Sequence, residues 1–387
     1  MGHDPLLDSL FRPIALKRLT IANRLAMAPM TRMFSPDGTP DEAVVEYYRK
    51  RAAGGVGLIV TEGVGVDHPA AVGEGSGTPS HIPLLHGDAP LAGWRRVVDA
   101  VHREGGVIFP QLWHQGPFRI EGTGRHPEAP SMRPSGLWGP GGGFSTVSPD
   151  YIPKVIAPTR PMTEGEIADC IHGFARSARN ARDVGFDGIA IHGASGYLVD
   201  SFFWPQTNLR TDRYGGDMAA RTTFGVELVH AIREAVGPDL PILFRFGQWK
   251  QQDFMAKIAE SPDELGVLLR ALAEAGVDMF DASTLYFSAP AFEGSDLGLA
   301  GWARTLSGKP TIAVGGVGLS ENLFKSFETG GAQVENNFYD AAARIERGEF
   351  DMIALGRALI ADPDWPNKVR RGEKTLAYSR DMLMSLA

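Results

Sequence analysis

The sequence is poor in cysteine, in excess basic charge and in long apolar runs. Cys170 is the single cysteine among 387 residues, so we expect no disulfide framework, no Cys-ligated zinc site and no Cys-bound iron–sulfur cluster. Lysine and arginine number 38 against 46 aspartate and glutamate residues, for a net charge of −8. This charge argues against nucleic acid as a partner, because phosphate binding needs a basic surface.

The sequence also lacks segments that would direct it to a membrane or out of the cell. No apolar run approaches the roughly 18 residues that a membrane-spanning helix needs. The start of the chain, MGHDPLLDSLF, lacks the basic and apolar regions of a signal peptide. We therefore expect a cytoplasmic protein with no membrane partner.

Short apolar runs alternate with longer amphipathic stretches along the whole chain. We predict strands at 24–29, 57–63, 106–113, 187–193, 241–247, 277–283, 310–316 and 350–356. Helical patterns lie at 41–54, 88–105, 164–185, 218–236, 262–276, 320–330 and 363–371. Eight strands alternating with helices predict a (β/α)8 TIM barrel. The alternative is a doubly wound open sheet, but no G-x-G-x-x-G follows the first strand.

We find no domain boundary and treat residues 1–387 as one α/β barrel domain. A long stretch rich in glycine and proline, residues 113–163, follows the third predicted strand. Long loops in compact domains are usually functional. We expect this excursion to cross the barrel mouth, with a short hairpin in it.

The predicted carboxyl ends of the strands, where such barrels carry their active sites, are rich in hydrogen-bond donors and aromatic side chains. They hold no cluster of carboxylates, which disfavours a two-carboxylate glycosidase and a hard-metal site, and we expect no metal. Gly315 and Gly316, with Gly356 and Arg357, stand at the last two strand ends, the usual phosphate site of this fold. The alternative is that these glycines serve tight turns only.

Gln111 and Arg245 follow apolar strand residues. Gln111 could donate and accept at a flavin or pyrimidine edge, or it could be a satisfied core amide. Arg245 needs an anionic partner, either a ligand or a structural carboxylate. His192, Ser195 and Tyr197 share a glycine-rich turn, where a histidine could bind a carbonyl oxygen and a tyrosine could donate a proton.

Several long motifs together resemble the Old Yellow Enzyme family of FMN-dependent oxidoreductases. They are LFRPIALKRLTIANRLAMAPMTRM (10–33), LIVTEG (58–63), QLWHQG (111–116), APS (129–131), IHGASGYLVDSFFWPQTNLRTDRYGG (191–216), RF (245–246) and ALGRALIADPDW (354–365). The resemblance covers nearly the whole chain. It implies a TIM barrel that binds FMN and uses NADPH or NADH to reduce the activated C=C bond of α,β-unsaturated carbonyl or nitro compounds.

The resemblance also implies a role for each candidate residue. Ala28, Pro29, Met30, Thr31, Gly63, Gln111, Arg245, Gly315, Gly316, Gly356 and Arg357 would bind FMN. His192 and Ser195 would bind the activating oxygen of the substrate, and Tyr197 would be the proton donor. Apart from the resemblance, we expect Trp113 and His114 to line the substrate pocket, with ordinary packing as the alternative for Trp113. We expect a small-molecule substrate. Whether the chain forms a homo-oligomer is left open by the sequence.

The sequence departs from the family pattern at informative positions. Ser195 stands where the family usually has Asn or His, so carbonyl recognition is in question. Double-bond isomerisation or desaturation on the same flavin therefore stays an alternative, as does a flavin-binding barrel with little ene-reductase activity. The segment GQWKQQDF (247–254) also departs from the family pattern. Residues 378–380 lie where some members send an arginine into a neighbouring subunit; the alternative is a frayed tail.

Overall fold

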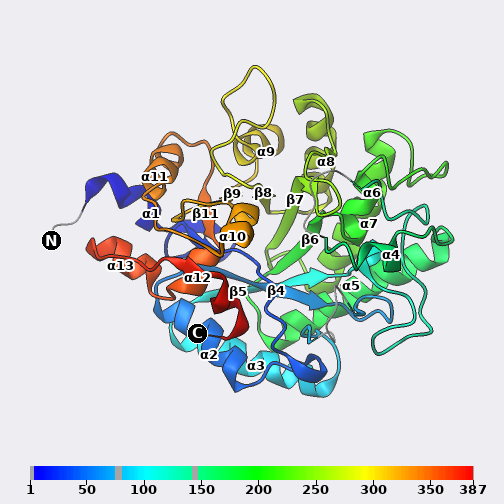
Figure 1. Cartoon of the computed structure of the whole chain (residues 1–387), viewed down its shortest axis with the longest axis horizontal. Coiled ribbons are helices and arrows are strands. Elements are labelled where there is room, and N and C mark those ends of the chain that lie inside the picture. Colours follow the sequence, from blue (N-terminus) through cyan, green and yellow to red (C-terminus); the bar gives the residue numbers. More distant parts are fainter. Residues whose placement is uncertain (1–3, 75–80, 142–146, 387) are drawn as a thin grey trace.

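The computed structural model describes residues 4–74, 81–141 and 147–386. Eight parallel strands form a closed barrel in the order β11-β3-β4-β5-β6-β7-β8-β9 (Figure 1). Their bounds are β3 Leu25–Met27, β4 Leu58–Gly65, β5 Val107–Trp113, β6 Ile189–Ser195, β7 Ile242–Lys250, β8 Met279–Ser283, β9 Thr311–Val314 and β11 Met352–Leu355. Each of the eight predicted runs contributes one of these strands. The predicted TIM barrel is confirmed, and the open sheet is excluded.

Helices surround the barrel and largely follow the predicted pattern. The expected ones are α2 Glu42–Ala53, α3 Asp88–Arg103, α5 Glu164–Val184, α7 Met218–Val236, α8 Pro262–Ala275, α10 Leu323–Thr329 and α13 Trp365–Arg371. Short helices that the sequence analysis did not predict are α1 Asp8–Phe11, α4 Ile152–Val155, α6 Leu198–Phe203, α9 Leu299–Ser307, α11 Phe338–Glu346 and α12 Arg357–Ala361.

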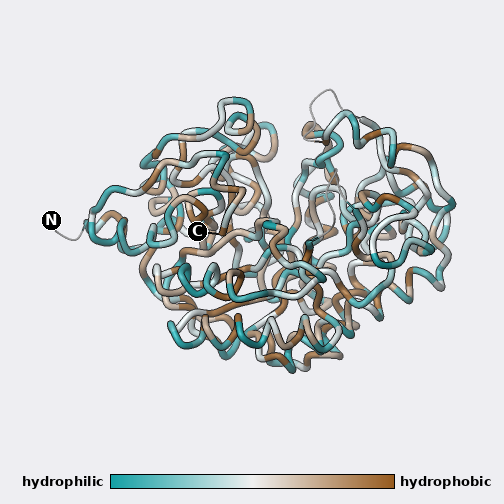
Figure 2. Tube along the Cα trace, turned by 60° about the horizontal axis from the view of Figure 1, so that its bottom comes forward, coloured by the Kyte–Doolittle hydropathy of each residue, from teal (hydrophilic) through white to brown (hydrophobic). Residues whose placement is uncertain are grey.

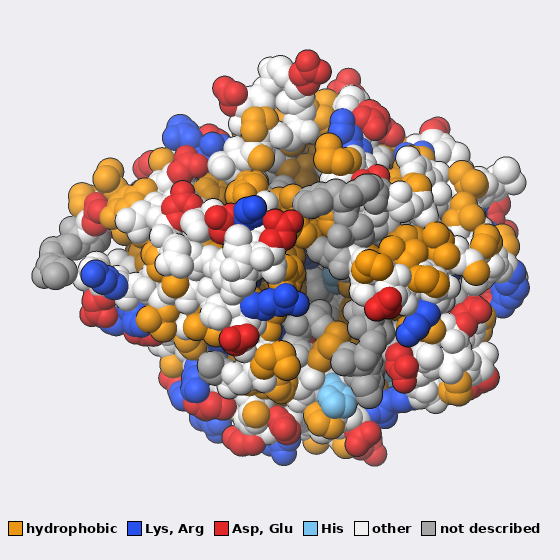
Figure 3. Space-filling model, viewed as in Figure 1, with side chains coloured by type: hydrophobic (Ala, Val, Ile, Leu, Met, Phe, Trp, Pro, Cys, Tyr) orange, Lys and Arg blue, Asp and Glu red, His pale blue; other side chains and the backbone are white. Residues whose placement is uncertain are grey.

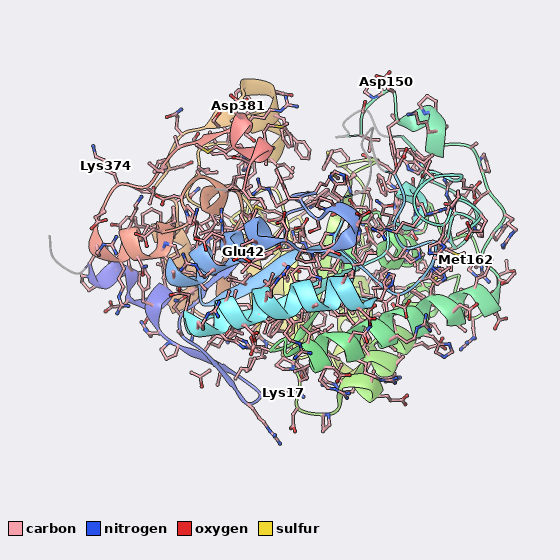
Figure 4. The ribbon with its side chains drawn as sticks, turned by 90° about the horizontal axis from the view of Figure 1, so that it is seen from below. Lys17, Glu42, Asp150, Met162, Lys374 and Asp381 are labelled. Atoms are coloured by element: carbon pink, nitrogen blue, oxygen red, sulfur yellow. The ribbon has the colours of Figure 1, made fainter. Side chains whose placement is uncertain are left out.

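Buried side chains fill the barrel interior, and one of its two ends is closed while the other is open. Buried side chains from the strands form the interior cluster, which Ile14, Leu16 and Ile21 of the β1–β2 hairpin close at one end (β1 Ile14–Leu16, β2 Leu19–Ile21). Figure 4 shows Lys17 of this hairpin at one end of the molecule, with Asp150 and Asp381 at the other. In Figure 2, hydrophobic and hydrophilic stretches of the tube alternate along the chain. The open, functional end is therefore the one that the excursion and the C-terminal segment flank.

The excursion has its own small core. Phe118, Trp138, Tyr151 and Val155 form a buried cluster, and Tyr197 packs against it. The described part of the excursion contains α4 and a short 3₁₀ turn but no hairpin, so the expected hairpin is wrong for these residues, and residues 142–146 lie outside the description. The excursion thus supports one wall around Tyr197.

The C-terminal segment is ordered rather than frayed. β12 (Tyr378–Ser379) pairs with β10 (Gly331–Ala332), and the Arg32 side chain donates to the carbonyl oxygens of Met382, Leu383 and Ser385. No helix in the described ranges is long and apolar enough to cross a bilayer.

Candidate functional site

A cavity of about 290 Å³ opens at the carboxyl ends of the strands. The space-filling view is hollowed near its centre (Figure 3). The predicted site residues that line this cavity are Ala28, Pro29, Met30, Thr31, Gln111, His192, Ser195, Tyr197, Arg245, Gly315, Gly316, Gly356 and Arg357. They come from six strands that are far apart in the sequence, and barrel closure brings them to one place.

The segment from His192 to Tyr197 carries the reactive side chains. The His192 and Tyr197 rings meet edge to face with centroids 4.9 Å apart. Burial, with a smaller effect of Arg245, lowers the pKa of His192 to about 3. This imidazole is therefore neutral at neutral pH and donates through one nitrogen only. Burial raises the pKa of Tyr197 to about 12, although a hydrogen bond with Gln251 acts in the opposite direction.

Ser195 has an unusual backbone at the centre of this segment. Its φ angle is +67°, in the left-handed region where residues other than glycine are uncommon and Asn, Asp and His are enriched. The β6–β7 pairing shifts register between Gly193 and Ser195, where Ser195 stands opposite Lys250. The strand irregularity turns the chain so that both Ser195 and Tyr197 line the cavity.

The glycine-rich wall lies at the ends of β9 and β11. Gly315 has φ +139°, and a Cβ there would lie 2.7 Å from the backbone oxygen of Thr284, so the close approach excludes a side chain. Arg357 is held beside it, donating to the carbonyl oxygens of Asn322 (3.0 Å) and Glu321 (2.7 Å). The result is a bare backbone next to a fixed guanidinium, which suits a phosphate group.

Arg245 has a structural carboxylate as its partner and also faces the cavity. It lines the cavity, and it forms an ion pair with Asp281 at 2.5 Å and donates to the Ser283 hydroxyl at 3.0 Å. Asp281 is 2% exposed. Its carboxylate balances the buried guanidinium when no anion is near, so the arginine does not depend on a ligand for burial.

Two predicted residues do not line the cavity. A Cβ on Gly63 would lie 2.8 Å from the Trp113 ring, so this glycine accommodates the indole. Trp113 in turn stacks on His192 (6.4 Å between centroids) and meets Tyr197 edge-on (5.0 Å). Both residues support the walls that carry His192 and Tyr197, and their predicted roles at the flavin and the substrate stay predictions.

His114, expected in the pocket, points elsewhere. It belongs to a buried cluster with His68 and Cys170, whose nitrogen and sulfur atoms lie within 4.8 Å of one another. One cysteine therefore does not by itself exclude a mixed His/Cys metal site. However, the second ring nitrogen of each histidine accepts a backbone N–H, from Gly116 to His114 and from Ala70 to His68. A metal-bound imidazole donates from that nitrogen, so the cluster suits neutral, hydrogen-bonded rings.

A second cavity, of about 720 Å³, lies beside this cluster, between the loop after β4 and the excursion. Its wall mixes Asp67, His68 and Arg125 and contains none of the predicted site residues. It is separate from the site described above.

Sequence reasoning did not assign Trp249 and Gln251, which line the first cavity. Both follow from the length of β7, which runs to Lys250 rather than to the predicted end at 247. Trp249 donates from its indole to the Ser283 carbonyl at 3.1 Å. The one indication of these two residues in the sequence was that residues 247–254 depart from the family pattern.

The family of the chain follows from its match to a family model. The model of the NADH:flavin oxidoreductase / NADH oxidase family matches residues 9–375. The chain belongs to this family, that of the Old Yellow Enzymes. The resemblance noted from the motifs is thereby confirmed, and the family is one of FMN-dependent oxidoreductases.

Relatives of this Old Yellow Enzyme family member carry different names. A "Metal reductase" of Desulforamulus reducens is 34% identical over 94% of the chain and 49% of the relative, and an "NADH oxidase" of Thermoanaerobacter brockii is 34% identical over 97% and 52%. The chain thus spans about half the length of these two relatives. "12-oxophytodienoate reductase 7" of Oryza sativa is 30% identical over 96% of the chain and 90% of the relative.

Solved structures share the whole fold. Morphinone reductase in complex with tetrahydroNAD superposes with a TM-score of 0.78 at 27% identity, over 97% of this chain and 93% of that one.

The described cavity fits FMN, the cofactor of the family. The Gln111 side-chain nitrogen is buried and has no hydrogen-bond partner among the described residues, and the pyrimidine edge of a flavin offers carbonyl oxygens to such a donor. The glycine wall and Arg357 suit the phosphate at the other end. A buried donor without a partner is costly. A bound flavin ring would give the Gln111 nitrogen a hydrogen-bond acceptor and remove that cost.

Proposed function

We propose that this chain is an FMN-dependent ene-reductase that uses NADH or NADPH to saturate the activated C=C bond of α,β-unsaturated carbonyl or nitro compounds. FMN, when bound, supplies the redox chemistry by taking a hydride from the nicotinamide and giving it to the electrophilic carbon of the alkene. Ala28 to Thr31, Gln111 and Arg245 would hold its ring, and Gly315, Gly316, Gly356 and Arg357 its phosphate.

The observation that carries the proposal is the pairing of His192 with Tyr197 on the wall of the cavity that fits FMN. A neutral His192 can donate one hydrogen bond to the activating oxygen of the substrate and so polarise the alkene. Tyr197 keeps its proton at neutral pH because its pKa is about 12, and it can give that proton to the other alkene carbon. The reductase names among the relatives support this reading.

Anaerobic visible spectra test the proposal. We expect the holoenzyme spectrum to bleach with NADPH or NADH and to return with 2-cyclohexenone. Bleaching without return for every enone and nitroalkene would contradict the ene-reductase. It would favour isomerisation or desaturation, an alternative that the short Ser195 side chain keeps open.

Tyr197→Phe tests the proton donor. We expect the alkene half-reaction to slow by roughly 10²–10⁴-fold, since a general acid contributes about that factor, while flavin reduction by the nicotinamide stays within about two-fold. Stopped-flow measurement of the two half-reactions separates them. An unchanged alkene half-reaction would show that another group supplies the proton.

A further inference from the structure

We propose that Gln251 is a positioning residue for Tyr197: its carboxamide holds the phenol oxygen and donates to the phenolate left when Tyr197 gives up its proton. The inference rests on the proposed function. It assigns a role to a residue from the segment 247–254, which departs from the family pattern.

The backbone places Gln251 beside the reactive segment. It follows β7 directly, and the β6–β7 pairing sets its neighbour Lys250 opposite Ser195. The backbone N–H and the side-chain nitrogen of Gln251 both reach the Ser195 carbonyl oxygen at 3.4 Å. Since a carbonyl oxygen only accepts, the contact turns the amide nitrogen of Gln251 toward Ser195. Its side chain lines the same cavity as Tyr197, and its effect is to lower the pKa of Tyr197 against the larger opposing effect of burial.

The other neighbours of Tyr197 are mainly rings. Trp113 meets it edge-on at 5.0 Å, Phe118 is tilted at 5.0 Å, and His192 meets it edge-on at 4.9 Å. A phenolate among such rings is poorly solvated, as the raised pKa of Tyr197 reflects. In the proposed role, the second N–H of the Gln251 amide donates to the oxygen where the charge develops, and such donors stabilise developing anions.

A buried ion pair fixes this end of β7. The Lys250 ammonium donates to Asp200 at 2.9 Å and to the carbonyl oxygens of Gly247 (3.2 Å) and Gln248 (2.9 Å). Asp200 also accepts the Gly196 N–H at 2.6 Å, between Ser195 and Tyr197 in the chain. Lys250 and Asp200 are both fully buried. The ion pair therefore ties β7 to the Ser195–Tyr197 segment, so Gln251 has a rigid base.

The proton-transfer step defines what Gln251 does. The O–H bond of Tyr197 breaks, and a C–H bond forms at the alkene carbon that did not receive the hydride. The phenolate keeps the electron pair of the broken bond and later regains a proton from solvent. The amide of Gln251 loses no proton. It favours the step by stabilising its anionic product and by holding the phenol oxygen toward the cavity.

Two variants separate this role from a structural one. Gln251→Met keeps the length of the side chain and removes the hydrogen bond. We expect it to slow the alkene half-reaction with 2-cyclohexenone by about ten-fold, equivalent to one hydrogen bond of roughly 1.4 kcal/mol, and to leave the NADPH half-reaction within about two-fold. Gln251→Glu can donate only while protonated. We expect its alkene half-reaction to fall as pH rises through the titration of the new carboxyl group, unlike that of the wild type.

The control is Gln333→Met, an exposed glutamine outside the cavity, which should leave both half-reactions unchanged. Equal rates for wild type and Gln251→Met would overturn the inference while leaving the proposed function intact, provided that Tyr197→Phe is slow. A fast Tyr197→Phe would instead reject the proton donor, and with it the role of Gln251.

A readout independent of turnover is the tyrosine ionisation of the oxidised holoenzyme. The ultraviolet pH titration of each protein, minus that of its Tyr197→Phe counterpart, reports Tyr197 alone. We expect ionisation at a higher pH in Gln251→Met than in the wild type, because the phenolate loses its donor. No shift would overturn the inference even if no enone is turned over.

Discussion

Ser195 combines a strained backbone with a side chain that is short for its position. A left-handed residue costs roughly 1–2 kcal/mol unless it is glycine, and asparagine tolerates this region better than serine. Strain of this kind clusters at functional sites. The carbonyl oxygen of Ser195 is held by Gln251, so the surrounding structure maintains the conformation.

Ser195→Asn should therefore improve two properties at once. We expect the free energy of unfolding to rise by about 0.5–1 kcal/mol, because asparagine relieves part of the left-handed cost. We also expect faster alkene reduction with 2-cyclohexenone, because the longer amide can donate to the substrate oxygen. Urea unfolding and stopped-flow kinetics measure the two effects. Ser195→Ala is the control, which should gain neither; an asparagine variant that matches it would contradict the argument.

At this scale the sequence selected residues that come together wherever a polar residue follows the apolar residues of a strand. Gln111, His192 and Arg245 all do so, and all line the cavity. It could not place Gln251, because QWKQQ reads as a polar loop while the strand in fact continues to Lys250. It left packing open as the alternative role of Trp113, and the indole does pack against His192 and Tyr197, because tertiary packing sets the direction of a side chain at an irregular strand end.

At the scale of elements, the buried Lys250–Asp200 pair joins the end of β7 to α6. Removing one partner leaves an uncompensated buried charge. We expect Lys250→Met to lower the free energy of unfolding by about 3–5 kcal/mol. The double variant Lys250→Met with Asp200→Asn should recover part of this loss, because no unpaired charge remains. Chemical denaturation of the three proteins measures it; a double variant less stable than Lys250→Met would contradict the explanation.

Helix prediction succeeded mainly where a side chain caps the N-terminus of the helix. α5 begins with a capping box between Thr163 and Glu166, and α8 follows the N-cap residue Ser261, whose hydroxyl accepts from Glu264 N–H. The helices α6, α9 and α11, which were not predicted, have no side-chain hydrogen bond at their N-caps and are at most nine residues long. Their positions depend on packing against the barrel, which a single sequence does not display.

For the whole molecule, the buried carboxyl of Glu62 links stability to pH. Its side chain accepts the backbone N–H groups of Arg32 and Met33, and burial raises its pKa to about 7. An unfolded glutamate titrates near about 4.3. Between these values the folded chain holds a proton that the unfolded chain has released. The free energy of unfolding therefore falls as pH rises through this window, by up to about 1.4 kcal/mol per pH unit from this group.

Glu62→Gln should remove this part of the pH dependence. We expect the wild type and the variant to differ in the slope of unfolding free energy between about pH 4.3 and pH 7, and to run parallel above that window. Denaturant unfolding at several pH values, with FMN held constant, measures the slopes. Glu42→Gln, at an exposed position (Figure 4), should retain the wild-type slope. Equal slopes for wild type and Glu62→Gln would show that Glu62 does not titrate in this range.

The barrel as a whole could be predicted from the rhythm of apolar runs, since eight strands alternating with helices have few other arrangements. The course of the C-terminal segment could not. Its pairing with β10 and its contacts with Arg32 join positions more than forty residues apart in the first case and about 350 in the second. Such contacts leave no local pattern in the sequence.

The closure of the barrel between β3 and β11 has a consequence for biosynthesis. Ala28 follows the first barrel strand and Arg357 follows the last, yet both line one cavity. They are synthesised more than three hundred residues apart. Most of the chain has therefore left the ribosome before the cavity can form. Long-range parallel pairing of this kind is slow and prone to aggregation. The cofactor can therefore be held only after the barrel has closed, and supply of flavin during expression should improve yield by capturing closed barrels.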